Sequence, residues 1–364
     1  MAGAVDGSTS EEGTVTAPSP HAAPGTAHAL DAPAVTPGTA HAPDAPAARR
    51  IPDFFIVGHQ KCGTTALYLM LQSHPQIYMP EEKEPRFFIP ELRPLPVKGK
   101  MPKRPATLDA YLALFDGAAP GQLAGEASPQ YLRYEDVPAA IAQVQPNARI
   151  IALLREPADF LRSFHGQMLH NRVESEKDFQ RAMSLEDARR RGERLPRGCR
   201  RQSWLLYSDH VRYVEQLRRF HEVFGEERVL VLIYEEYRRA NEAVVREVLR
   251  FLEIDDTVAV EPLDTKPLKD VRVRRLHQLT GALQEARRNP AAVNPALRAL
   301  DAIIPGAARE KLGSHWRRLI YRPRAEPSEE FMLELRRRFK PEVEALSEYL
   351  GRDLLSVWGY DRIG

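Results

Sequence analysis

The stretch of residues 54–71, FFIVGHQKCGTTALYLML, constrains the fold more than any other part of the chain. The apolar run at residues 54–57 is rich in aromatic and β-branched side chains, which predicts a buried strand that ends at Gly58. A short turn follows, after which apolar residues at 67, 69, 70 and 71 have helical spacing. The stretch therefore predicts a strand, a turn of the size that holds a phosphate group, and a helix.

The chemistry of this turn is that of an anion site. Gly58 and Gly63 permit backbone angles closed to other residues, so successive N–H groups can converge on an anion at the helix N-terminus. Lys61 adds a mobile cation. In a Walker A loop the lysine directly follows the second glycine, whereas here Lys61 precedes Gly63, and Thr64 and Thr65 follow. This order moves the lysine toward the bridging atoms of a leaving group.

Composition excludes several classes of protein. A hydrophobic content of 43% in 364 residues supports a large core, and a net charge of +2 argues against a general nucleic-acid binder. Two cysteines give no disulfide framework and suit the cytoplasm. Cys62 is either a reactive thiol or, as we favour, a small residue that fills a tight turn. The absence of a signal sequence and of an apolar run of about 18 residues predicts neither secretion nor a membrane span.

Residues 1–50 differ in composition from the rest of the chain. Alanine, proline, glycine, threonine and histidine dominate them, and residues 23–33 are nearly repeated at 36–46. A segment with so few large apolar side chains predicts a disordered tail. Its histidines are too widely spaced for a metal site, and no metal is expected. The folded domain is then residues 51–364.

Strands and helices are expected to alternate along that domain. Further strands are predicted at residues 76–79, 148–154 and 229–234, and helices at 107–115, after Pro157, and at 204–224, 242–252 and 328–350. In the helix at 107–115 the buried face is expected to hold Leu108, Leu112 and Phe115. The alternation predicts an α/β fold of three layers, P-loop-like, with a mostly parallel central sheet flanked by helices.

A second group of candidate residues follows the strand at 76–79. Glu84 lies between two prolines and close to two phenylalanines in PEEKEPRFF, and a rigid apolar setting raises the pKa of a carboxyl and favours proton acceptance. Glu82 is the second candidate. From the residues alone, a charged surface loop is the alternative interpretation.

Four segments together resemble a known family. Residues 58–67, GHQKCGTTAL, look like the 5′-phosphosulfate loop of PAPS-dependent sulfotransferases, closest to the heparan sulfate (glycosaminoglycan) branch and its bacterial relatives. KEPRFF at 83–88 is similar to the family's segment with the catalytic base, GEASPQY at 125–131 to its E-[KA]-[ST]-P-x-Y segment, and ARIIALLREP at 148–157 to its 3′-phosphate strand. Residues 90–105 and 171–203 have no match; we expect the first to form a lid or a binding element and the second an acceptor-binding insertion.

The resemblance implies a role for each matching residue. Lys61 and Glu84 are the implied catalytic residues. The implied contacts to PAPS are Lys61, Cys62, Gly63, Thr64, Thr65, Arg155, Ser163 and, from a flexible loop at 263–276, Arg272 or Arg274. The implied acceptor side comprises Glu126, Ser128, Tyr131 and Gln167, although a structural turn is the alternative for Glu126 and Tyr131.

The chain departs from the family pattern at three positions. Ala127 replaces a lysine of some relatives, Phe160 replaces a common arginine that Arg162 could supply, and Gln167 replaces a histidine of some relatives.

By resemblance, the reaction is transfer of the sulfuryl group of PAPS to a hydroxyl, less readily an amine, of a glycan or a glycosylated or lipidated small molecule, with release of PAP. High alanine, arginine and proline content suggests a bacterial enzyme of secondary metabolism. The oligomeric state stays open. One alternative is a nucleotide-dependent P-loop kinase, but this sequence lacks the Walker-type lysine and the magnesium carboxylate that such a kinase needs. The other is a non-catalytic nucleotide- or glycan-binding protein, and the presence of Lys61 and Glu84 argues against it.

Overall fold

The computed structural model describes residues 49–94, 104–197, 199, 201–258, 270–271, 321–322 and 326–363. Except for residues 49 and 50, the predicted tail lies outside this part of the chain. So do Arg272 and Arg274, nearly all of the predicted loop at 263–276, and most of the predicted lid at 90–105.

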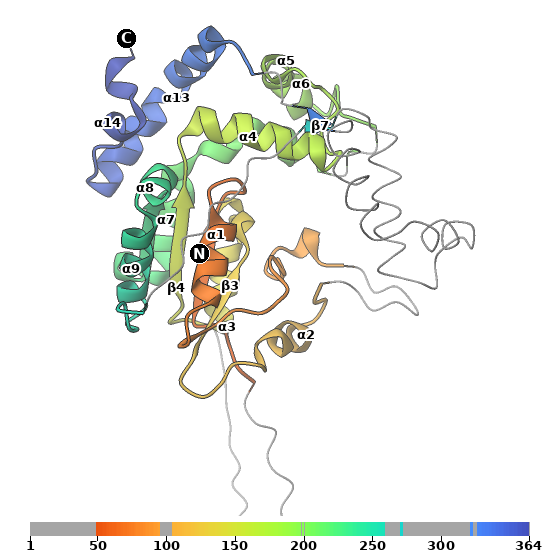
Figure 1. Cartoon of the computed structure of the whole chain (residues 1–364). Coiled ribbons are helices and arrows are strands. Elements are labelled where there is room, and N and C mark those ends of the chain that lie inside the picture. The colour runs from red at the N-terminus through yellow and green to blue at the C-terminus, as the bar shows by residue number, and fades with distance from the viewer. Residues whose placement is uncertain are drawn as a thin grey trace, which may run out of the picture. The chain divides into compact units, whose positions relative to one another are not determined.

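A five-stranded parallel sheet forms the centre of the domain (Figure 1). Its strands are β1 (Phe54–Gly58), β2 (Ile77–Tyr78), β3 (Leu123–Ala127), β4 (Arg149–Leu154) and β5 (Val229–Ile233), in the order β2-β3-β1-β4-β5. All four pairings are parallel, and every residue of β1 is buried. Burial on both faces explains why β1 reads as an unbroken apolar run.

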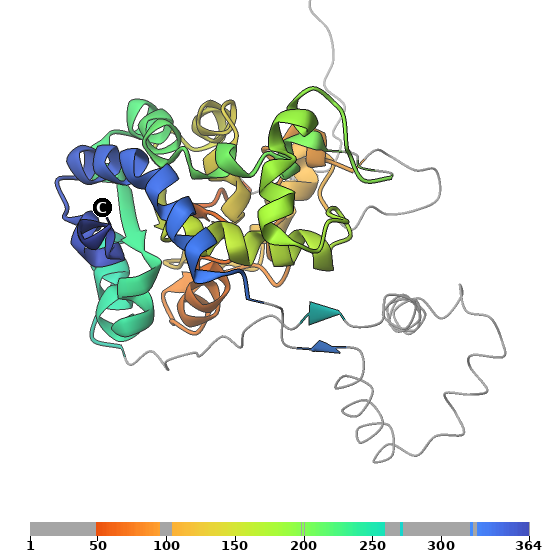
Figure 2. The same ribbon diagram turned by 90° about the horizontal axis from the view of Figure 1, so that it is seen from above.

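Helices cover both faces of the sheet, as Figure 2 shows from above. On one side lie α3 (Val137–Val144) and α7 (Tyr213–Phe224), and on the other α1 (Thr64–Gln72) and α9 (Asn241–Phe251). The long helix α13 (Glu329–Leu350) packs against α7 and against α4 (Pro157–His170). The predicted three-layer α/β fold is thus confirmed.

Shorter elements complete the described part of the chain. They are α2 (Leu108–Leu112), α5 (Phe179–Ser184), α6 (Glu186–Arg190), α8 (Tyr234–Arg239), α14 (Leu354–Trp358), and the antiparallel pair β6 (Asp270–Val271) and β7 (Tyr321–Arg322).

Two helix predictions need correction. The helix predicted at 204–224 begins only at Tyr213, and 3₁₀ turns at Gln202–Leu205 and Tyr207–Val211 precede it. All four residues from 204 to 207 are buried, and one face of a single helix cannot bury four consecutive side chains. In α2, Leu108 is exposed and Tyr111 is buried with Phe115, because the helix tightens into a 3₁₀ turn after Leu112 and changes phase.

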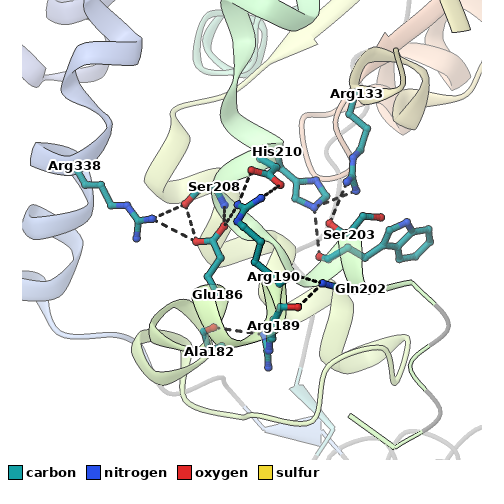
Figure 3. A network of polar contacts seen from close by, with 12 residues as sticks. Arg133, Ala182, Glu186, Arg189, Arg190, Gln202, Ser203, Ser208, His210 and Arg338 are labelled. Atoms are coloured by element: carbon teal, nitrogen blue, oxygen red, sulfur yellow. Dashed lines mark hydrogen bonds and ion pairs between the residues drawn. The ribbon is translucent and has the colours of Figure 1, made fainter. Parts of the chain in front are cut away.

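The segment at 171–203 is tied to the domain by buried charge. Glu174 and Arg189 form an ion pair of 2.7 Å with both side chains inaccessible to solvent, and the Tyr207 hydroxyl donates to Glu174 at 3.0 Å. In the network of Figure 3, Glu186 accepts from the Ser208 N–H and hydroxyl and also pairs with Arg338 of α13. These contacts fix α5 and α6 to the rest of the domain.

Close approach of two strands makes Gly58 irreplaceable at the end of β1. Its φ is +129°, and a Cβ at this position would lie 2.3 Å from the carbonyl oxygen of Leu153 on β4. Both the backbone angle and the space therefore require glycine.

We expect the substitution Gly58→Ala to lower the free energy of unfolding by about 3 kcal/mol or more, because strain and overpacking add. Urea denaturation measures this loss. Gly121→Ala is the matched control, since Gly121 also has a positive φ but a Cβ there would meet no atom within 4 Å, and it should cost only about 1 kcal/mol. Equal losses in the two variants would show that the approach to Leu153 is unimportant.

Candidate active site

Parallel pairing brings the candidate residues to one edge of the sheet. The loop at residues 59–63 follows β1, Ser128 follows β3, Arg155 follows β4 and Tyr234 follows β5. In open parallel sheets, ligands bind outside the carboxyl ends of the strands. Segments separated along the chain thus form one candidate site.

The turn after β1 concentrates positive charge. Lys61 and Gly63 both have left-handed backbone angles, with φ of 74° and 86°, and α1 begins directly after Gly63. Burial and the nearby charge of Arg155 lower the pKa of Lys61. Thr64 is buried at the helix start and Thr65 is exposed. Two cations beside a helix N-terminus favour an anion at this position.

The remaining side chains of the loop are neutral and buried. Burial raises the pKa of the Cys62 thiol to about 12, so the protonated thiol predominates at neutral pH, which argues against a reactive thiol. His59 forms a hydrogen bond of 2.9 Å with the Gln216 side chain, and burial lowers the pKa of its imidazole to about 3. Gln216 lies on α7, far along the chain, and no local sequence pattern indicates this contact.

Protein contacts hold Arg155 on several sides. Its Nη1 donates to the carbonyl oxygen of Lys61 at 3.1 Å, and its guanidinium lies 4.7 Å from the centre of the Tyr234 ring. The Tyr213 hydroxyl donates to the Arg155 carbonyl at 2.9 Å. Among the residues that the structure describes, none forms a hydrogen bond with the buried Nε atom of Arg155. Arg155 is therefore fixed beside Lys61 with donor capacity to spare.

The helix that follows Arg155 places the other residues predicted near it. The Glu156 carboxylate caps α4 by accepting from the N–H groups of residues 158 and 159, and Ser163 is half-buried on that helix. Arg162 pairs with Asp159 at 3.1 Å and with Glu326. Phe160 is buried against the His59 ring, with 4.9 Å between ring centres. The position of the family's common arginine is thus part of the core here.

Gln167 lies one turn after Ser163 on α4. Its side-chain amide donates to the side-chain Oδ1 of Asn171 at 3.0 Å. Its predicted contact with an acceptor stays a prediction.

The Glu84 carboxylate lies between two cations. Lys83 donates to it at 3.1 Å and Arg86 forms a second ion pair with it. Burial alone raises the pKa of Glu84, but the charges and hydrogen bonds of Lys83 and Arg86 outweigh burial, and the pKa falls below its ordinary value. Our expectation of a raised pKa is wrong, because Lys83 and Arg86 both pair with the carboxylate. The backbone of Arg86 is left-handed, with φ of 55°. The second candidate, Glu82, is exposed.

The segment after β3 supports the loop that carries Glu84. The Glu84 N–H donates to the carbonyl of Ala127 at 3.1 Å, the Arg86 N–H to the Ser128 hydroxyl at 3.0 Å, and the Phe88 N–H to the Tyr131 hydroxyl at 3.3 Å. Both Ser128 and Tyr131 are inaccessible to solvent. Their contacts correspond to a supporting role behind Glu84, and acceptor binding by them stays a prediction.

Glu126, at the end of β3, is fully buried. The Tyr111 hydroxyl donates to its Oε2 at 3.0 Å. Burial raises the pKa of Glu126 to about 7, although neighbouring hydroxyl groups and the charge of Lys83 favour the ionised form. A buried carboxyl of this kind titrates in the physiological range.

Among the residues that the structure describes, no cluster of three or more histidine, cysteine, aspartate or glutamate side chains could hold a metal ion. A search of the same residues finds no helix with the length and apolar character to cross a membrane.

Comparison with known proteins identifies the family. Residues 51–280, more than half of the chain, match the family model described as "Sulfotransferase domain", and the chain belongs to this family. The crystal structure of a sulfotransferase from Alicyclobacillus acidocaldarius aligns with a TM-score of 0.56 and 27% identity over 85% of this chain and 99% of that chain. The P-loop-like fold implied by the sequence resemblance is confirmed.

Human relatives match over shorter stretches. The bifunctional heparan sulfate N-deacetylase/N-sulfotransferase 3 is 33% identical over 119 residues, which cover 30% of this chain and 12% of that protein. Carbohydrate sulfotransferase 15 is 32% identical over 160 residues, which cover 32% of this chain and 27% of that protein. The matches therefore span a minor part of both relatives.

The pKa of Glu126 predicts a pH-dependent stability. Its value of about 7 in the folded protein exceeds the ordinary 4.5, so the contribution of its protonated form is complete below about pH 4.5 and is lost as the pH rises through 7. Between pH 5 and pH 8, the unfolding free energy of the protein should therefore fall by about 3 kcal/mol relative to Glu126→Gln. Urea denaturation at several pH values measures the difference.

The control for this experiment is Glu344→Gln, at an exposed position on α13. It should leave the pH dependence unchanged. A difference between the protein and Glu126→Gln that stays constant with pH would contradict the raised pKa.

Proposed function

We propose that the protein is a PAPS-dependent sulfotransferase that transfers a sulfuryl group to a hydroxyl, less readily an amine, and releases PAP. The observation that carries the proposal is the placement of Lys61 and Arg155 together beside the turn at the start of α1, in a chain of the sulfotransferase domain family. PAPS would supply the activated sulfuryl group and a phosphate leaving group.

The residues present fit such a nucleotide. Lys61 and the backbone N–H groups of residues 63–65 would hold the 5′-phosphosulfate, and Arg155 with Ser163 the 3′-phosphate. Within the described part of the chain, the buried Nε of Arg155 pairs with Glu235 at 3.9 Å but makes no hydrogen bond, so the guanidinium keeps donor capacity for a phosphate. Cys62 would contribute its backbone, because its thiol stays protonated. Arg272 and Arg274 remain further predicted contacts.

Each reactive group has one task in the proposed reaction. Glu84 removes the proton of the acceptor hydroxyl, and its lowered pKa keeps it ionised well below neutral pH. Lys61 and the loop N–H groups neutralise the charge that develops on the leaving phosphate oxygen as the bond between that oxygen and sulfur breaks. The loop cations serve this purpose without a metal ion.

The proposed acceptor is a glycan or a glycosylated or lipidated small molecule. Support comes from the partial matches to a heparan sulfate N-sulfotransferase and to carbohydrate sulfotransferase 15. A cytoplasmic location and a place in bacterial secondary metabolism belong to the same proposal.

Nucleotide binding tests the proposed function directly. PAP at about a hundred times its dissociation constant should stabilise the protein by roughly 2.7 kcal/mol without magnesium, a shift that thermal denaturation detects. Arg155→Ala should abolish most of this shift, because it removes the fork that binds the 3′-phosphate. Stabilisation by ATP with magnesium but not by PAP would favour the kinase alternative instead.

The ion pair of Glu84 predicts a shifted pH profile. In Arg86→Gln the carboxylate loses one of its two ion pairs, so its pKa should rise and the acid limb of kcat/KM should move to higher pH. The profile is measured with PAPS and an acceptor found by screening sugar glycosides. Arg93→Gln is the control, since Arg93 contacts the Phe87 carbonyl and ring rather than Glu84. An unchanged acid limb in Arg86→Gln would exclude Glu84 as the base.

A further inference from the structure

The contacts around Arg155 continue to the far end of the described chain. Glu235, in the first turn of α8, lies with its Oε1 3.9 Å from the Arg155 Nε. The indole N–H of Trp358, on α14, donates to the Oε2 of Glu235 at 2.8 Å. This second contact joins residues 123 positions apart, and Trp358 lies beyond the stretch that matches the family model.

Both oxygens of Glu235 accept hydrogen bonds. Oε2 accepts from Trp358, and Oε1 accepts from the backbone N–H of Glu156 at 3.4 Å. An indole N–H and a backbone N–H can only donate hydrogen bonds, so both oxygens of Glu235 must act as acceptors. The carboxylate plane is thereby fixed, and Oε1 is held on the side of Arg155.

The guanidinium is bounded by protein on three sides. Lys61 accepts from Nη1, the Tyr234 ring lies against its face, and Glu235 lies at the Nε edge. Within the described part of the chain, Nη2 donates no hydrogen bond to protein. The 3.9 Å distance to Glu235 exceeds a hydrogen bond, so an incoming phosphate has no bond between Arg155 and Glu235 to break.

We propose that Glu235 and Trp358 are positioning residues that orient the Arg155 guanidinium toward the 3′-phosphate of the nucleotide. The proposal rests on the proposed function. Glu235 acts through Arg155 and does not touch the ligand, and Trp358 acts through Glu235. An arginine held in this way loses less conformational freedom when it binds a phosphate, which favours binding.

The test compares PAP with 5′-AMP, which lacks only the 3′-phosphate. Isothermal titration calorimetry at constant ionic strength gives both dissociation constants, and their ratio isolates the 3′-phosphate contact. We expect Trp358→Phe and Glu235→Gln each to weaken PAP binding about tenfold and to leave 5′-AMP binding within about twofold. Unchanged 5′-AMP binding also shows that the variant is folded.

The sign of the Glu235→Gln effect separates positioning from simple repulsion. If Glu235 only repelled the phosphate, loss of its charge would tighten PAP binding. If Glu235 positions Arg155, the variant weakens PAP binding, because a glutamine amide has only one acceptor oxygen. In one orientation its NH₂ group faces the Trp358 indole N–H, and in the other it faces the Glu156 N–H and Arg155. Either orientation sets donor against donor. PAP binding that is tighter or unchanged in this variant would overturn the proposal.

A matched control is Trp204→Phe. Trp204 is buried to the same degree as Trp358 and donates its indole N–H to the Tyr134 hydroxyl at 3.4 Å, on a different part of the domain. It should leave the PAP to 5′-AMP ratio unchanged. A ratio that also stays unchanged in Trp358→Phe would refute the role of Trp358. Equal affinity of the unaltered protein for PAP and 5′-AMP would instead refute the proposed function itself.

Discussion

Parallel pairing of β1 between β3 and β4 is the constraint on which the site depends. It aligns the carboxyl ends of the strands, so that the anion loop, the support of the Glu84 loop and Arg155 all lie at one edge. The pairing is tight where Gly58 meets Leu153, and this contact sets the point at which the chain turns into the loop. The sheet register therefore determines where the charged residues of the candidate site lie.

The candidate site holds two neighbouring positive charges, those of Lys61 and Arg155. Burial and the nearby charge of Arg155 both disfavour the charged form of Lys61. Glu84 is the opposite case, a carboxylate held ionised by Lys83 and Arg86. Charges that are already fixed in place can stabilise the charge that develops during a reaction, because they do not have to reorganise. In the proposed function, an anionic ligand would relieve the repulsion at Lys61, and Glu84 would accept the proton.

Local signals make part of this structure predictable from sequence. The strand, loop and helix around Lys61 and the strand before Arg155 are predictable, because apolar runs and glycines act over a few neighbouring residues. β3 is not predicted as a strand, since its sequence LAGEA has small residues and a carboxylate; Gly125 is required there because Phe54 and Met79 fill the space of a side chain. The pairs His59 with Gln216, Glu174 with Arg189 and Trp358 with Glu235 join distant segments, and no local pattern indicates them.

The hydrogen bond between Trp358 and Glu235 also bears on the order in which the protein matures during synthesis. The ribosome releases β1, α1, Arg155 and Glu235 well before Trp358, so a nascent chain can form the sheet and the anion loop while the Oε2 of Glu235 still lacks its indole donor. The hydrogen bond between Trp358 and Glu235 can form only after α14 has left the exit tunnel and packed. Translation thus supplies the strands of the sheet before it supplies the indole donor of Glu235.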